Sequence, residues 1–380
     1  MKTQKKIVVG IDIRDLKIAK TGLKTYLEEL CKEFAKPDPL FDFIFITNNS
    51  TIYTGARKWG KLFEHIRYQW WKQIVLPFKA KRSGCKIIFC TDFFVPYFSW
   101  GILTVPVFHD AFFWEYPHHY NKYWRTLFVQ LGLRAAKKSA CIITPTNYTQ
   151  KRISFFSGIS TQNIIPVHEG PKRLPNYASE NRPIPQPYLL HIGTAEKRKN
   201  LPFLIEAFKE LIDSNHPSVP VNLCLVLGGQ FSNKSNLNDG SEILASIAAF
   251  QLKDRVILPG YILDGDLPAY YTHAAAYVFP SINEGFGIPI LEAFHYGIPV
   301  LIANNSCLPE VAGDAALQFD PYNKTSLVSQ LLQVLSNSEL RETLISKGKV
   351  QLQFFRWESA SHHLKKIFQH ILSQKSDSLL

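Results

Sequence analysis

Short apolar runs alternate along the chain with amphipathic segments of helical period. Residues 7–13 form the first run, and residues 23–34 follow with apolar side chains at every third or fourth position. The same alternation restarts at residues 188–192 and continues with an amphipathic segment at 201–212. Strands and helices that alternate in this way build parallel sheets covered by helices. The pattern therefore predicts an α/β protein with two Rossmann-like halves.

The length of 380 residues also favours two domains, because a single hydrophobic core rarely grows beyond about 250–300 residues. Residues 171–187 are rich in Pro, Asn, Arg and Ser and show no apolar period, so they are predicted to be a linker. We expect the N-terminal domain over 1–170 and the C-terminal domain over 188–355, followed by a last segment over 356–380.

The stretch from 276 to 300 carries the most informative polar pattern. An apolar run is followed by Glu284, by Gly285 and Gly287 on either side of an aromatic residue, and by a helix that should begin near Ile288. A glycine loop at a helix N-terminus offers free N–H groups to a phosphate. Glu284 and Glu292, separated by seven residues, would then be left for hydroxyls, and a nucleotide-sugar has both groups. The alternative is a tight turn with two solvated glutamates.

Three further candidates follow other predicted strands. Arg198 and Lys199 precede the helix at 201–212 and could neutralise a diphosphate, or could be a solvated charge run. The predicted strand at 105–108 is followed by His109, at the edge where parallel sheets bind ligands, although a capping role is the alternative. Gly22 lies in the predicted loop after the first strand, where it could serve the turn alone.

A metal site is not predicted. Asp264 and Asp266 form an Asp-x-Asp pair that could bind a divalent cation, but they directly precede a helical segment and are typical of its N-cap and first turn. The six cysteines form no Cys-x-x-Cys pair, which favours reduced thiols in a cytoplasmic protein. The chain has neither a signal-peptide pattern nor an apolar run of about 18 residues.

The net charge of +12 favours anionic partners. It does not distinguish phosphates from nucleic acid or a membrane surface. Residues 56–82 interleave Lys and Arg with aromatic residues, which suits peripheral association with an anionic membrane or an anionic acceptor. A solvated helix with its tryptophans in the core is the alternative. No nucleic-acid recognition motif is present, so we expect no nucleic-acid partner.

The stretch 277–300 resembles the Glu-x7-Glu signature of retaining nucleotide-sugar glycosyltransferases of family 4, which have the GT-B fold. The residues that carry the match are Pro280-Ser281, Glu284 to Pro289 and Gly297 to Val300. The order Gly-Thr-x-x-x-Arg-Lys-Asn at 193–200 is also similar, although many members have Arg directly after the glycine, where Thr194 stands. The resemblance covers nearly the whole chain and is strongest over 188–320.

The resemblance implies two Rossmann-like domains that face a central cleft, with the acceptor bound by 1–170 and the nucleotide-sugar by 188–355. The last segment, 356–380, would be a helix that returns to the N-terminal domain. The implied reaction transfers a hexosyl group, with mannose favoured, from a nucleoside diphosphate-sugar to a glycan or lipid-linked acceptor. It proceeds with retention, serves surface-polysaccharide assembly, and needs no cofactor and no metal, because a helix N-terminus and cations take the metal's place.

The resemblance also implies roles for single residues. Glu284 and the N–H groups of Phe286 and Gly287 would hold sugar hydroxyls, Glu292 the ribose, and His109 would lie beside the transferred sugar. The remaining residues of the implied nucleotide-sugar site are Gly22, Arg198, Lys199, Tyr261, Ile262, Gly285, Ile288 and Leu291. Two other functions stay open: a nucleotide-sugar epimerase of the same fold, and a basic nucleic-acid- or membrane-binding module without catalysis.

Overall fold

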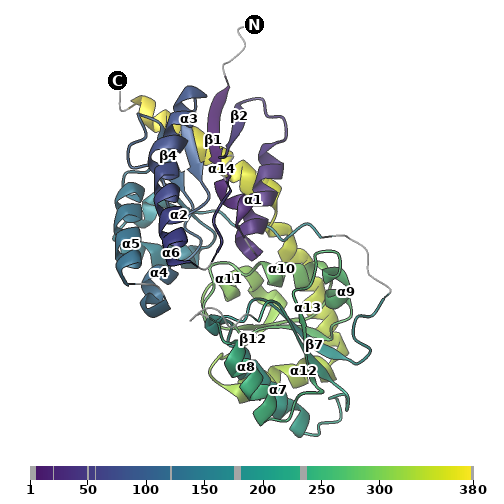
Figure 1. The fold of residues 1–380 in the computed structure, drawn as a ribbon. Helices are drawn as coiled ribbons and strands as arrows, with labels where there is room; N and C mark the ends of the chain where they lie inside the picture. The colour runs from purple at the N-terminus through teal and green to yellow at the C-terminus, as the bar shows by residue number, and fades with distance from the viewer. Residues whose placement is uncertain are drawn as a thin grey trace. The chain divides into compact units, whose positions relative to one another are not determined.

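The computed structural model describes residues 6–19, 21–48, 51–55, 57–119, 122–174, 181–231 and 238–377. The chain divides into two compact units (Figure 1). Unit 1 comprises residues 1–169 together with 357–380, and unit 2 comprises residues 170–356. Each unit has its own parallel sheet with helices on both faces, so the α/β class predicted from the sequence is confirmed.

The sheet of unit 1 has the order β2-β1-β3-β4, with all strands parallel. Its strands are β1 (Ile7–Asp12), β2 (Phe41–Ile46), β3 (Ile87–Cys90) and β4 (Leu103–Pro106). A bridge between Val107 and Ile143 continues the sheet into the parallel pair β5 (Ile142–Thr144) and β6 (Ile164–Pro166). Helices cover both faces, which is why the central strands are apolar throughout.

Two groups of helices cover the faces of this sheet. On one face, α1 (Thr21–Phe34) and α14 (Trp357–Asp377) pack together over side chains such as Val9 and Phe89. On the other face lie α2 (Lys58–Trp70), the π-helix η2 (Trp71–Val75) and α3 (Leu76–Arg82). The remaining helices of unit 1 are η1 (Arg14–Lys17), α4 (Phe112–Glu115), η3 (Pro117–His119), α5 (Lys122–Ala136), α6 (Asn147–Ser157) and η4 (Thr161–Asn163).

The sheet of unit 2 has six parallel strands in the order β12-β11-β10-β7-β8-β9. The strands are β7 (Tyr188–Ile192), β8 (Cys224–Gly228), β9 (Val256–Gly260), β10 (Ala276–Phe279), β11 (Val300–Ala303) and β12 (Ala316–Phe319). The helices are η5 (Lys197–Lys199), α7 (Leu201–Asp213), α8 (Gly240–Ala249), α9 (Leu267–Thr272), α10 (Ile288–His295), α11 (Leu308–Ala312), η6 (Gly313–Ala315), α12 (Lys324–Ser336), α13 (Ser338–Gln351) and η7 (Leu352–Phe354).

The strand order of unit 2 determines where a ligand would bind. From β7 the chain builds outward through β8 to β9, and from β10 it builds outward on the other side. The neighbours β7 and β10 therefore form the switch point of the sheet, where loops diverge and leave a crevice at the carboxyl ends of the strands. In unit 1, β1 and β3 form the equivalent switch point.

Two details differ from the sequence-based expectations. The strand predicted at 105–108 spans Leu103–Pro106, so His109 follows it by three residues rather than one. Gly22 lies in the first turn of α1, which begins at Thr21, and not in the preceding loop. The end of β4 and the start of α1 thus differ from their predicted positions by one or two residues, as is common at the ends of strands and helices.

Candidate active site

The loop after β7 carries two of the predicted cations. Arg198 and Lys199 form η5, and Asn200 then takes a left-handed conformation (φ 57°) from which α7 begins. The Ile282 N–H donates to the Arg198 carbonyl at 2.8 Å, which fixes this loop against the loop after β10. The short strand pairing of β7 with β10 thus brings together two loops that lie far apart in sequence.

Glu284 lies between these two cations. Its Oε1 is 2.6 Å from Lys199 Nζ, and its Oε2 accepts a hydrogen bond of 2.5 Å from Arg198 Nη1. Arg198 Nε also donates to Glu196 at 2.7 Å. The side chains of Glu284 and Lys199 are each 9% exposed. The switch point of unit 2 therefore holds a buried carboxylate shared by two cations.

Burial and charge act in opposite directions on this cluster. Burial raises the pKa of the Glu284 carboxyl, but Arg198 and Lys199 outweigh it and hold that pKa at about 2. Burial also lowers the pKa of the Lys199 amine, against the pull of Glu284. The two cations face two carboxylates, Glu284 and the less buried Glu196, so a phosphate at this site would share the cations with them.

The N-terminus of α10 lies beside this cluster. Gly287 occupies the N-cap with φ +107°, and a Cβ there would be strained and crowded by Phe279 and Leu308. No side chain forms a cap hydrogen bond at Gly287; Pro289 has no N–H, and the Ile290 N–H donates to the Gly287 carbonyl at 3.0 Å. The anion site expected at this helix end therefore stays a prediction. Phe286, by contrast, packs its ring against Phe355 at 5.8 Å. The remaining predicted residues of this segment are Gly285, half-buried, and Ile288 and Leu291, both buried in the core.

Glu292 lies one turn into α10 and is buried. Its Oε2 accepts a hydrogen bond of 2.7 Å from the Tyr271 hydroxyl, which comes from α9. Burial raises the pKa of the Glu292 carboxyl, and the Tyr271 hydrogen bond only partly offsets that effect. Sequence reasoning did not find Tyr271, because the contact joins two helices and has no signal in local spacing.

The loops that follow β7, β8 and β9 contact one another. Gly229 has φ +151°, and a Cβ on it would lie 1.7 Å from the Gly193 carbonyl oxygen, so only glycine fits. The Gly229 N–H donates to the Gly260 carbonyl at 2.8 Å. Of the two residues predicted to contact the base, Tyr261 is exposed and Ile262 is buried. A base contact from Ile262 would therefore come from its backbone.

The structure adds two buried polar residues to the site. His191 Nδ1 contacts the Val278 carbonyl at 2.9 Å, while its Nε2 has no hydrogen-bond partner among the described residues. Burial lowers the pKa of this imidazole to about 4, so it is neutral. Ser281 Oγ is likewise buried, and its interaction with the Glu284 carboxyl helps to lower the pKa of that group. A histidine in an apolar run was the only sequence signal for the first, and a Pro-Ser pair for the second.

His109 and Gly22 belong to unit 1. His109 Nε2 contacts the Thr91 carbonyl at 3.0 Å, its Nδ1 lies 3.6 Å from Glu169 Oε1, and the ring edge meets Tyr26 at 4.8 Å. Burial lowers the pKa of the His109 imidazole, but Glu169 outweighs it and leaves that pKa raised. Gly22 is exposed at the N-terminus of α1. The other predicted site residues all lie in unit 2.

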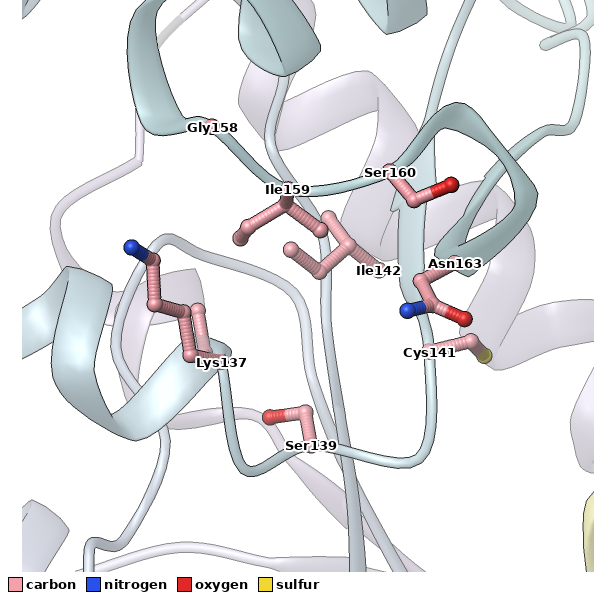
Figure 2. A pocket seen from close by; sticks show the side chains of 9 residues that line it. Lys137, Ser139, Cys141, Ile142, Gly158, Ile159, Ser160 and Asn163 are labelled. Atoms are coloured by element: carbon pink, nitrogen blue, oxygen red, sulfur yellow. The ribbon is translucent and has the colours of Figure 1, made fainter.

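A cavity of about 290 Å³ in unit 1 is separate from these residues (Figure 2). It lies between the end of α5 and the turn after α6, with Lys137 on one side and Ser160 and Asn163 on the other. No predicted site residue lines it.

Asp264 and Asp266 do not act as a pair. Asp266 takes the N-cap position of α9 without a side-chain cap bond, and Asp264 is 2.6 Å from Lys172 Nζ. Within the described ranges, no group of three or more His, Cys, Asp or Glu side chains is arranged to hold a metal ion. In the same part of the chain, every helix is too short or too polar to cross a membrane.

The family model and the relatives found by sequence comparison are all glycosyltransferases. The family model described as "Glycosyl transferases group 1" matches residues 176–351. An O-antigen chain mannosyltransferase B from Escherichia coli is 30% identical over 274 residues, which cover 68% of each chain. The serotype-specific mannosyltransferase WbdA of E. coli is 28% identical over 198 residues, which cover 51% of this chain and 23% of that longer protein.

The chain belongs to the group 1 glycosyltransferases. Solved structures agree in fold. A sucrose-phosphate synthase from Thermosynechococcus elongatus has a TM-score of 0.72 at 16% identity and covers 97% of this chain and 100% of its own. The Anabaena protein HepE, solved with UDP and glucose, has a TM-score of 0.66 at 15% identity, with 96% and 100% covered. The GT-B fold and the glycosyltransferase activity predicted from the sequence are thereby confirmed.

Proposed function

We propose that this glycosyltransferase moves a hexosyl group, most simply mannosyl, from a nucleoside diphosphate-sugar to a hydroxyl of a glycan or lipid-linked acceptor in surface-polysaccharide assembly. The observation that carries the donor assignment is the cluster of Arg198, Lys199 and Glu284 at the switch point beside the N-terminus of α10. The sugar is suggested by two relatives that are named mannosyltransferases. HepE, solved with UDP and glucose, supports a nucleotide-sugar donor.

The two cations and the helix N-terminus suit the diphosphate. Arg198 and Lys199 would share their charge between Glu284 and the phosphates, and the N–H groups of α10 would add further donors. We assign charge neutralisation to these groups and to no metal ion or other cofactor. Glu284 would accept hydrogen bonds from sugar hydroxyls, Glu292 from the ribose, and the exit loops of β8 and β9 would contact the base.

The reaction is assigned to retention, as in the family 4 enzymes that the Glu284-x7-Glu292 spacing resembles. The bond between the anomeric carbon and the phosphate oxygen breaks, and the bond to the acceptor oxygen forms on the same face. The acceptor proton passes to the leaving phosphate oxygen. Glu284 is engaged by two cations and serves the sugar hydroxyls rather than as a nucleophile. Catalysis then rests on leaving-group stabilisation and positioning.

Two measurements test this assignment. In a thermal-shift panel of GDP-, UDP-, dTDP- and ADP-sugars, one nucleotide should raise the melting temperature clearly above the others. Transfer from that donor should fall by orders of magnitude in Lys199→Ala and Glu284→Ala and should persist in the presence of a metal chelator. The exposed neighbour Lys197 provides the matched control Lys197→Ala. Near-normal turnover in both site variants, or an inverted anomeric product, would contradict the proposal.

A further inference from the structure

The helices α2 and α3 of unit 1, with η2 between them, place their large apolar side chains on the outside. Trp59 is 82% exposed and Trp70 is 61% exposed. The full row, called the outer stripe here, consists of Trp59, Phe63, Ile66, Trp70, Ile74 and Phe78, all exposed. A surface helix normally turns such residues towards the core, and a contiguous exposed apolar patch marks an interaction surface.

The inward face of the same helices combines core side chains such as Trp71 and Leu76 with charged ones. Lys72 is buried and its Nζ lies 2.6 Å from Asp12 and 2.5 Å from Asp92, at the switch point between β1 and β3. Glu64, one turn from Tyr68, accepts a hydrogen bond of 2.6 Å from the buried Arg14. This network fixes the rotation of the helix about its axis, because turning the outer stripe inward would remove buried charges from their partners. The exposure of the stripe is therefore built into the fold.

The π-helix keeps the stripe in one row. Trp70, Ile74 and Phe78 follow one another in steps of four residues. In an α-helix each such step passes a full turn by about 40°, so Phe78 would lie about 80° away from Trp70. The i→i+5 turns of η2 hold more residues each than an α-helical turn and take up this excess. As a result the row runs straight for about 28 Å, from Trp59 to Phe78.

The surroundings of the stripe are basic. Residues 56–82 contain eight Lys or Arg and one acidic residue, Glu64, which is turned inward. The exposed cations beside the stripe are Lys61, Lys79, Lys81 and Arg82. Trp100 from the loop after β3 meets Phe78 edge-on at 6.4 Å and widens the apolar surface, with the exposed Phe98 close by in sequence.

We propose that the outer stripe docks this protein on an anionic phospholipid membrane, with the tryptophan and phenylalanine side chains at the headgroup boundary and the cations against lipid phosphates. A row of exposed aromatic side chains with Lys and Arg beside it has the composition that membrane interfaces favour. A second copy of the chain is a poorer occupant, because it would bring two basic rims together. The docking surface is independent of the donor site, which lies in unit 2.

Vesicle co-sedimentation tests the proposal with the full chain. The unmodified protein should bind vesicles that contain phosphatidylglycerol, bind vesicles of phosphatidylcholine alone much more weakly, and release at high salt. Trp59→Ser and Trp70→Ser should each weaken binding about tenfold or more. Lys61→Gln and Arg82→Gln should each weaken it about fivefold. Controls are Phe155→Ser and Tyr322→Ser, which remove equally exposed aromatic rings elsewhere.

Loss of membrane binding can be measured separately from loss of sugar transfer. Transfer to an acceptor in free solution should be the same in the stripe variants and the controls, so loss of membrane binding is read without reference to the donor site. If the unmodified chain fails to bind anionic vesicles, or the stripe variants bind as well as the controls, the proposal is wrong. Self-association in sedimentation velocity that Trp70→Ser abolishes would also overturn it and would assign the stripe to a second copy.

Discussion

Lys199 Nζ lies 2.6 Å from Glu284 Oε1 across the boundary between two neighbouring strands. One side chain follows β7 and the other follows β10, so the contact exists only because these strands meet at the switch point of the sheet. Each residue compensates the burial of the other. The pair is thus part of the stability of unit 2 as well as a candidate for donor recognition.

The acid stability of unit 2 should depend on Glu284. Its pKa of about 2 lies below the ordinary 4.5, so the stabilisation is complete above pH 4.5 and is lost as pH falls towards 2. We expect Glu284→Gln to lower the free energy of unfolding by on the order of 3 kcal/mol at pH 7 and by much less near pH 2. Urea unfolding as a function of pH measures this. A difference that does not change with pH would contradict it.

Tyr271→Phe should damage the ribose side of the site. The variant leaves Glu292 buried without its hydroxyl donor, which should reduce stability by about 1–2 kcal/mol. It should also raise the pKa of the Glu292 carboxyl further and weaken nucleotide binding. The stabilisation of the protein by the best nucleotide in a thermal-shift series measures the second effect. Tyr270→Phe, on the same short helix, is the matched control.

His109 should titrate with Glu169. Since Glu169 raises the pKa of the imidazole, the pair stabilises the fold below the ordinary histidine pKa of 6.5, and this contribution is lost as pH rises through the raised value. Glu169→Gln should therefore lower the pKa of His109 in an NMR titration. Its effect on unfolding should be largest at acid pH and fade at alkaline pH. An unchanged His109 titration would show that the 3.6 Å contact has no electrostatic role.

Lys72→Met should destabilise unit 1 by about 3–5 kcal/mol, because it leaves the buried Asp12 and the partly buried Asp92 near each other without their cation. Lys61→Met, at an exposed position on the preceding helix α2, should change stability by less than about 0.5 kcal/mol. Denaturant unfolding compares the two. A similar small change in both would mean that Asp12 and Asp92 find other partners.

Local patterns were sufficient for much of the fold. The apolar runs at 7–13 and 188–192 contain β1 and β7, and the apolar side chains of 23–34 include Tyr26, Leu30 and Phe34, which pack in the core of unit 1. Glycines that require a positive φ, such as Gly287, also leave a local signal, because no other residue takes that conformation without strain.

Contacts between distant segments left no such signal. Glu284 was predicted to face hydroxyls, but its two cation partners follow from the pairing of β7 with β10, which spacing along the chain does not encode. Residues 56–82 were predicted either to meet a membrane or to bury their tryptophans. The structure buries Trp71 and exposes Trp59 and Trp70, because Asp12 and Asp92 draw Lys72 inward. That choice depends on partners 20 to 60 positions away.

The π-helix η2 accommodates one more residue than an α-helix would between Trp70 and Phe78. Removing a single residue between Trp71 and Val75 would convert that turn to an α-helix and place Phe78 seven residues after Trp70, within about 20° of the same direction. The outer stripe would therefore keep its row after such a deletion. The π-helix thus absorbs a change of one residue in chain length without rotating the outer face of the segment.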